Sequence, residues 1–320
     1  MCIRDSLICI NFQFLHALSF VGGIALYKNV MIFLSTDKYP SPFDMLIMYD
    51  AGVDHVIYYG EVTPDKAKQL ILDAMFPRGP KGVKHTKLFI GGNDVKAVEE
   101  IAKIAEKTMF PPFEMSIIVD PQGGYTTAAA LLAKVKAALK KHFNQELKGV
   151  NAVVLAATGV VGRSVSLLLA REGASVSVCS RSFDKARQLA DELNSLVGGQ
   201  NVKPSEHYPQ DIYATCRDAD VVIATGAPGV QLLPKSVLEK LTKCKVVADA
   251  NAVPPTGIEG LNPNDDEVKL ANNIIGIGAL AAGFLKFKVE VKLIQRALEA
   301  SKGVFALDSA YSVANEILGL

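Results

Sequence analysis

Apolar residues along this chain occur in short continuous runs that alternate with longer segments in which they recur at helical spacing. A short run bounded by turn residues is typical of a strand buried on both faces, and the helical spacing is typical of an amphipathic helix. From about Asn29 onward this alternation predicts a mostly parallel sheet with helices on its faces. The strands expected in this first series are 30–35, 55–60, 87–92 and 115–120, and the helices are 41–52, 63–76, 95–110 and 126–143.

A second series of alternating segments begins near Leu147. Its first strand is almost entirely apolar, and a glycine-bearing turn after it opens a helix. Two late helices have no strand of their own, so we expect them to cross back and pack on the first half of the chain. The strands expected in this series are 150–157, 175–180, 219–226, 245–250 and 273–278, the helices between them are 160–173, 183–197 and 233–244, and the two late helices are 281–300 and 309–318.

Composition limits the classes of function. The length of 320 residues is sufficient for two domains with separate cores. The net charge of +1 provides no basic excess that would attract nucleic acid. Five cysteines without a CxxC pair and five scattered histidines indicate neither a disulfide framework nor a metal site. Free thiols are typical of a reducing compartment, which favours a cytoplasmic protein.

The first 27 residues do not fit the alternation. Leu7–Tyr27 has about the length of a membrane span of ~20 residues, but polar residues interrupt it and no signal-peptide cleavage site closes it. Met1–Ser6 reads MCIRDS, which is the translation of a transposase mosaic-end adapter used in DNA libraries. We therefore interpret residues 1–27 as a non-native or disordered extension, derived from adapter and upstream read-through, with the natural start at Met31 or Leu26. We expect no membrane partner.

The turn Ala156–Arg163 lies where a dinucleotide-binding loop must lie, directly after a buried strand and at the start of a helix. Free backbone amides and the positive end of the helix dipole bind a pyrophosphate at such a turn. In the register of the GxGxxG motif, Ala157 takes the place of the first glycine. The alternative is an ordinary tight turn between strand and helix. The residues predicted to contact the cofactor here are Thr158, Gly159, Val161 and Gly162.

The end of the next strand favours NADP over NAD. An NAD site usually has an acidic residue there for the ribose hydroxyl groups. This chain has Ser180 and Arg181, with Lys185 one turn further on. A guanidinium group can bind a 2′-phosphate through two hydrogen bonds. NADP is therefore the expected cofactor, with NAD as a weaker alternative, and the competing interpretation is that Arg181 is a solvated loop residue.

Two more loops follow strands of the second series, at the strand ends where open α/β sheets bind ligands. Thr225, Gly226 and Ala227 form the first, which can pass close to the nicotinamide ribose. The second contains Asn251, a candidate partner for the nicotinamide carboxamide. The alternative for each residue is a role in turn formation alone.

An ordered set of motifs from about Lys28 to the end resembles the NADP-dependent methylene-tetrahydromethanopterin dehydrogenases of one-carbon metabolism. Some members of that family also accept methylene-tetrahydrofolate, and these motifs do not separate the two pterins. The resemblance is carried by FIGG, PPF, DPQGGYTTAAA, VVLAATGVVG, NAVPPTGIEG and GIGALAAGFLKFK, in this order.

The resemblance implies direct transfer of a hydride from the methylene bridge of the reduced pterin to NADP⁺, which leaves a methenyl cation. No proton is abstracted, so the enzyme has to hold the pterin and nicotinamide rings face to face and accommodate the positive charge of the transition state. The resemblance places an active-site lysine at Lys286. Asp120 and Thr126 are further catalytic candidates, with helix capping as the alternative, and Gln122 and Thr127 are candidate substrate contacts. A surface lysine is the alternative for Lys286.

The fold implied is α/β, with an N-terminal α/β domain, a doubly wound Rossmann-type domain for NADP, and the active site in the cleft between them. The pterin-binding catalytic domain is expected at 28–147, completed by helices at about 290–320, and the NADP-binding domain at 148–289. The resemblance also suggests a homo-oligomer. Two competing interpretations are an NADP oxidoreductase that resembles shikimate dehydrogenase or glutamyl-tRNA reductase, and a non-catalytic NADP-binding sensor, which would not need Asp120, Thr126 and Lys286.

Overall fold

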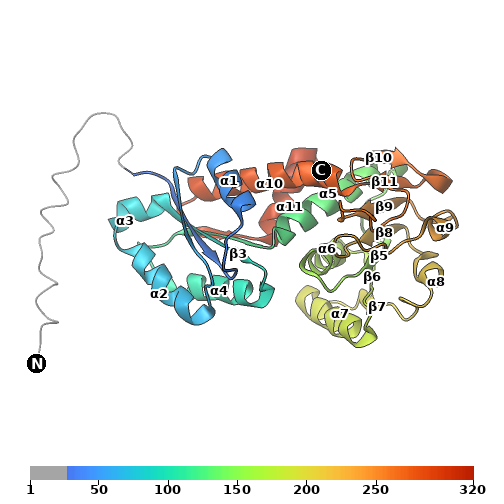
Figure 1. Cartoon of the computed structure of the whole chain (residues 1–320), viewed down its shortest axis with the longest axis horizontal. Coiled ribbons are helices and arrows are strands. Elements are labelled where there is room, and N and C mark those ends of the chain that lie inside the picture. The colour runs from blue at the N-terminus through green and yellow to red at the C-terminus, as the bar shows by residue number, and fades with distance from the viewer. Residues whose placement is uncertain (1–26) are drawn as a thin grey trace, which may run out of the picture.

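The computed structural model describes residues 27–320, which build two sheets with helices packed around them (Figure 1). The interpretation of the N-terminal extension falls on residues 1–26, outside the described part. Within residues 27–320 the first sheet has the order β12-β4-β3-β1-β2, and every neighbouring pair of strands is parallel. Its strands are β1 (Val30–Ser35), β2 (His55–Tyr59), β3 (Thr86–Gly92), β4 (Ser116–Pro121) and β12 (Gly303–Phe305).

Helices join the strands of the first sheet and cover them. The residue at the N-cap position caps two of these helices with its own side chain: the Ser41 hydroxyl accepts a hydrogen bond from the Asp44 amide, and the Asp94 carboxylate accepts one from the Ala97 amide. The helices are α1 (Pro42–Asp50), α2 (Pro64–Met75), the short α3 (Gly79–Gly82), α4 (Val95–Thr108) and α5 (Gly124–Phe143).

The second sheet has the order β10-β11-β9-β8-β5-β6-β7 and is parallel apart from β10, which runs antiparallel to β11. From β5 the chain builds outward to β6 and β7, and then returns to place β8 on the other side of β5. This reversal is the switch point at which doubly wound sheets bind their ligands, and it confirms the predicted α/β fold. The strands are β5 (Asn151–Leu155), β6 (Ser175–Val178), β7 (Val202–Pro204), β8 (Val221–Ala224), β9 (Val246–Asp249), β10 (Asp266–Lys269) and β11 (Ile275–Ile277), and the helices are α6 (Val160–Arg171), α7 (Phe183–Val197), α8 (Ile212–Cys216) and α9 (Lys235–Leu238).

Two late helices, α10 (Ala279–Glu299) and α11 (Leu307–Leu318), return to the first half of the chain, as expected. Both pack on α5, and the three helices run along the same side of the molecule between the two sheets (Figure 1). The buried face of α5 is rich in alanine, which lets its neighbours approach closely. In the described part of the chain, no helix combines the length and apolar character that a membrane crossing requires.

Several elements differ from the sequence-based expectation. The helix predicted at 233–244 is limited to α9, because the chain beyond it tightens into turns that bury Leu241 and lead directly into β9. Strand β7 lies in a stretch without a predicted element. Strands β10 and β12 were also missed, because both are short, largely exposed and without a run of apolar residues.

Candidate active site

A cavity of about 410 Å³ opens at the carboxyl ends of β1, β3 and β4. The N-terminal turn of α1 and the middle of α10 complete its wall. Because the strands are parallel, their carboxyl ends bring residues that are distant in sequence to the same edge of the sheet. The cavity is lined by Phe33, Ser35, Asp37, Ser41, Phe43, Asp44, Gly92, Asn93, Gln122, Gly123, Thr127 and Lys286.

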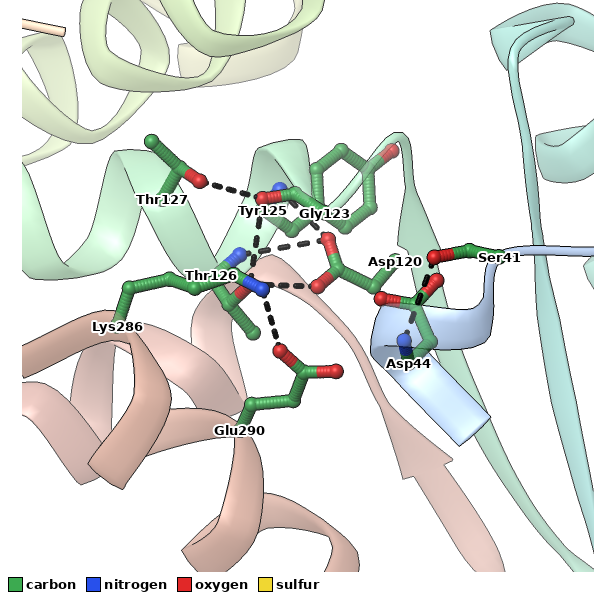
Figure 2. A network of polar contacts seen from close by, with 9 residues as sticks. All are labelled: Ser41, Asp44, Asp120, Gly123, Tyr125, Thr126, Thr127, Lys286 and Glu290. Atoms are coloured by element: carbon green, nitrogen blue, oxygen red, sulfur yellow. Dashed lines mark hydrogen bonds and ion pairs between the residues drawn. The ribbon is translucent and has the colours of Figure 1, made fainter. Parts of the chain in front are cut away.

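Lys286 lies at the centre of a group of charged side chains (Figure 2). Its Nζ atom donates to Glu290 Oε2 at 2.5 Å, one turn along α10. The same Nζ atom lies 4.1 Å from the centroid of the Phe43 ring, within the range of a cation–π contact. The Lys286 side chain is only 11% exposed, so the alternative of a solvated surface lysine does not describe its position.

Three carboxyl groups surround this ammonium group, and burial makes each of them easier to protonate. Burial raises the pKa of Glu290 to about 8 and that of Asp44 to about 6, and in both cases Lys286 opposes the shift while Asp120 adds to it. Burial also raises the pKa of Asp120, although Thr126, Lys286 and two backbone amides act against the shift. The negative charge of this side of the cavity therefore depends on protonation near neutral pH.

Asp120 and Thr126 lie behind the cavity and do not line it. The Asp120 carboxylate accepts hydrogen bonds from the Tyr125 amide at 2.8 Å and from the Thr126 hydroxyl at 2.6 Å, and thereby caps the first turn of α5. Both residues are almost fully buried. The capping interpretation thus describes their contacts. The charge of Asp120 also interacts with Lys286 and Asp44, which both line the cavity.

Gln122 and Thr127, the two candidate substrate contacts, line the cavity. Gln122 has a left-handed backbone with φ of 56°, and its side-chain amide donates to the Asn93 carbonyl at 3.3 Å. The Thr127 hydroxyl donates to the Gly123 carbonyl at 2.6 Å. These contacts fix the loop between β4 and α5, which presents both side chains to the cavity.

The turn between β5 and α6 has the geometry of a phosphate-binding loop. Gly159 has nothing within 4 Å of the position that a Cβ atom would occupy, so its backbone is open to a ligand. Gly162 is closely packed, because a Cβ atom there would lie 2.6 Å from the Thr225 hydroxyl. Ala157, at the first motif position, is buried in the core, and the left-handed conformation falls on Ala156, with φ of 57°. The alanine methyl group at 157 therefore points away from the loop opening.

A second cavity, of about 370 Å³, lies beside this turn. Thr158 opens onto it from the turn, and exposed Arg181 and Lys185 border it from the end of β6 and the first turn of α7. Their positive charge and the open space beside Gly159 fit a nucleotide with a phosphate on its ribose. The predicted cofactor residues that line this cavity are Thr158, Ser180, Arg181, Lys185, Gly226 and Ala227.

Five predicted cofactor residues are not in the lining of that cavity, namely Gly159 and Gly162 of the turn described above, and Val161, Thr225 and Asn251. Val161 packs against the core at the start of α6. The Thr225 hydroxyl donates to the Leu155 carbonyl at 2.9 Å and thus braces the end of β5. Asn251 is buried, and its side chain accepts from the Val253 amide and donates to the Pro255 carbonyl. Both polar ends of Asn251 are therefore engaged within its own loop.

The N-termini of α5 and α6 touch, close to Gly123 of the first cavity and Thr158 of the second. A Cβ atom on Gly124 would lie 2.6 Å from Val160 Cγ1, so only glycine permits this approach. Next to this junction, Arg163 of α6 forms ion pairs with Glu99 of α4 and Glu192 of α7. This junction fixes the spacing between the two predicted sites.

The chain is similar in sequence to known proteins. The family model described as "Methylene-tetrahydromethanopterin dehydrogenase, N-terminal" matches residues 42–122. Two proteins of Methylorubrum extorquens strain AM1 match 91% of this chain over 99% of their own length. One, named bifunctional protein MdtA, is 37% identical to it. The other, named NAD(P)-dependent methylenetetrahydromethanopterin dehydrogenase, is 34% identical.

The chain belongs to the methylene-tetrahydromethanopterin dehydrogenase family. Among solved structures, quinate dehydrogenase from Corynebacterium glutamicum in complex with NAD matches 92% of this chain and 100% of its own, with 12% identity and a TM-score of 0.48. The bifunctional methylenetetrahydrofolate dehydrogenase/cyclohydrolase FolD from Campylobacter jejuni matches 84% of this chain and 87% of its own, with 15% identity and a TM-score of 0.46.

In this dehydrogenase family member, sequence reasoning missed two carboxyl groups and an aromatic ring of the site. Asp44 and Phe43 lie in the first turn of α1, where an acidic residue is ordinary in a helix start and gives no distinct signal. The sequence does contain a signal for Glu290, which is a charged residue on the buried face of an amphipathic helix, four positions after Lys286. Within residues 27–320, no group of three or more His, Cys, Asp or Glu side chains is placed to hold a metal ion.

Proposed function

We propose that this protein is an NADP-dependent oxidoreductase that transfers a hydride from 5,10-methylene-tetrahydromethanopterin to NADP⁺ and forms the methenyl pterin in one-carbon metabolism. The family assignment supports this proposal, since one relative is named for that reaction. The observation that carries it is the contact between the starts of α5 and α6 at Gly124 and Val160, because Gly123 beside it lines the cavity at the first sheet and Thr158 lines the cavity at the second. Such an arrangement can hold a donor and an acceptor ring face to face.

The chemistry requires one C–H bond of the methylene bridge to break, with its electron pair leaving as hydride and a positive charge remaining on the pterin. Bound NADP⁺ supplies the hydride acceptor. No proton moves in this step, so the side chains have to place the pterin and balance its new charge. In our proposal Lys286, Gln122 and Thr127 contact the pterin, while Asp120 and Thr126 hold the start of α5 from behind.

The cofactor would lie along the second cavity. The amides at Gly159 would face its pyrophosphate, and Ser180, Arg181 and Lys185 would surround its ribose phosphate. Gly226 and Ala227 would border the adenosine side of the same cavity. We assign Gly162, Val161, Thr225 and Asn251 to the support of these loops, because their contacts lie within the protein.

We further propose that residues 28–147 with about 290–320 form the pterin-binding domain and that 148–289 form the NADP-binding domain. The return of β12 to the edge of β4 supports the first part of this division. We also propose a cytoplasmic location, in line with the free buried thiols of Cys179, Cys216 and Cys244. The family resemblance leads us to propose a homo-oligomer as well.

The proposed reaction is tested by incubating the purified chain with NADP⁺ and either methylene-tetrahydromethanopterin or methylene-tetrahydrofolate. We expect NADPH to form with the first pterin, and with the second at a lower or comparable rate. Absorbance of NADPH and of the methenyl product should rise together in equal amounts. Absence of turnover with both pterins would contradict the proposal, and shikimate is a suitable control substrate for the competing dehydrogenase interpretation.

Arg181→Gln is expected to weaken NADP⁺ binding by about 10- to 100-fold and to leave NAD⁺ binding unchanged. A hydrogen bond to a charged group contributes about 1.5–3 kcal/mol, and NAD⁺ lacks the phosphate that would receive it. Isothermal titration with each cofactor measures both affinities. Arg187→Gln is the matched control, because Arg187 lies on α7, which begins two residues after Arg181, and it forms its ion pair with Asp184 outside the second cavity. Equal losses for both cofactors would remove Arg181 from the phosphate site.

A further inference from the structure

Glu290 is a buried carboxyl group with one oxygen engaged and one not. It is 1% exposed, and its Oε2 atom accepts from Lys286 Nζ at 2.5 Å. Its Oε1 atom is buried and has no hydrogen-bond partner among the described residues. A buried carboxylate oxygen without a donor is costly, whereas the same group with a proton costs less. The surroundings of Glu290 therefore favour a carboxyl group that takes up and releases a proton. The ion pair with Lys286 alone does not account for the unpartnered Oε1 atom.

Charges from three elements face this group. Lys286 approaches it from α10 itself, Asp120 from β4, and Asp44 from the first turn of α1 (Figure 2). The ammonium group of Lys286 can balance only one of the three carboxyl groups. Repulsion among the carboxylates and burial therefore both favour one retained proton, and burial raises the pKa of Glu290 to about 8.

We propose that Glu290 is a positioning residue of the pterin site, which aims the Lys286 ammonium group at the cavity and, by holding or releasing one proton, sets the negative charge that the site presents to the reacting pterin. This inference rests on the proposed function. Lys286 lines the cavity and Glu290 does not, so Glu290 acts through Lys286 and through its electrostatic field.

The proton on Glu290 affects the reaction because the pterin gains positive charge as the hydride leaves. An ionised Glu290 stabilises that charge, and a neutral one does not. Hydride transfer to NADP⁺ should therefore become faster as pH rises through the ionisation of Glu290. The gain of one negative charge at Glu290 is expected to raise the rate of hydride transfer by about tenfold.

Glu290→Gln separates the orientation of Lys286 from the uptake and release of a proton. The amide oxygen can still accept a hydrogen bond from Lys286, but the side chain no longer titrates. We expect the single-turnover rate of hydride transfer to rise about fivefold between pH 7 and pH 9 in the wild type, which is most of the full tenfold change, and to stay flat in the variant. Glu299→Gln, an exposed position on the last turn of the same helix, should keep the wild-type profile. An unchanged rise in Glu290→Gln would overturn the proposal.

Thermal unfolding provides a second readout that does not depend on activity. The pKa of Glu290 is raised in the folded state, so that state binds more protons than the unfolded chain between pH 4.5 and about 8. This contribution to the stability of the wild type is present at low pH and is lost as pH rises through this range. The Tm of Glu290→Gln relative to the wild type should therefore increase from pH 5 to pH 8. A constant difference would contradict proton exchange at Glu290.

Glu290→Met completes the design and also replaces Glu290→Gln should that variant fail to fold. Methionine has a similar length but can neither accept from Lys286 nor titrate. We expect a flat pH profile together with a rate that is lower than that of Glu290→Gln at every pH. Equal rates in the two variants would remove the positioning role. Lack of turnover by the wild type would contradict the proposed function, and the unfolding measurement would still test Glu290.

Discussion

Gly124→Ala is expected to reduce kcat/KM for hydride transfer by about 10²-fold or more, because a displacement of about 1 Å between reacting groups has a cost of that size. The added Cβ atom would lie 2.6 Å from Val160 Cγ1 and 3.2 Å from Val160 Cβ. Valine is branched at Cβ and cannot rotate away easily. The starts of α5 and α6 would therefore have to separate, and the pterin and cofactor sites would separate with them.

A compensating substitution shows whether distance is the cause. Val160→Ala removes both methyl groups that the new Cβ atom would meet, so the double variant Gly124→Ala with Val160→Ala should recover most of the lost activity. Stopped-flow measurement of NADPH formation gives the hydride-transfer rate, and titration gives the NADP⁺ affinity, which we expect to change little. A double variant as slow as Gly124→Ala alone would refute the spacing argument.

Lys286→Met should lower kcat by about 10²- to 10³-fold, the usual effect of removing one preorganised polar group from an active site. The change leaves Asp44, Asp120 and Glu290 without their shared cation, so their protonated forms become more favourable. The folded variant then binds more protons than the folded wild type, so its stability relative to the wild type should fall as pH rises above about 6. Steady-state kinetics and unfolding at several pH values measure both effects.

Lys288→Met is the control for this second prediction. Lys288 is exposed on the same helix, two positions away, and lies outside the cavity. Its replacement should leave both kcat and the pH dependence of unfolding near those of the wild type. If Lys286→Met retained wild-type kcat, Lys286 would have no part in the reaction, even if the stability effect were present.

The local pattern of the chain was sufficient to predict the strand, turn and helix around the proposed cofactor loop. A buried strand, a glycine-bearing turn and a helix are continuous in sequence, so the position of Gly159 relative to Arg181 follows from a single supersecondary unit. The backbone detail was not predictable. The left-handed residue is Ala156, and the methyl group of Ala157 turns into the core, because the end of β5 packs there.

The proposed pterin half of the site depends on tertiary structure that local patterns do not contain. Asp44 and Glu290 are far apart in sequence, and they converge only because α10 returns to the first sheet and packs beside α1. The capping role of Asp120 was one of two open interpretations, and the choice required the positions of the Tyr125 and Thr126 amides. Short edge strands such as β12 carry too few apolar residues to be distinguished from a loop.

The pairing of β12 with β4 has a consequence for the order in which the protein is made on the ribosome. All strands of the second sheet leave the ribosome before β12, so the cofactor half can fold while the edge of β4 is still open. An open strand edge is available for pairing with other chains. Lys286 and Glu290 also emerge after that sheet, and a nascent chain therefore acquires its cofactor loop well before its pterin site. The segment from α10 to β12 thus both closes the exposed edge and supplies the late residues of the proposed site.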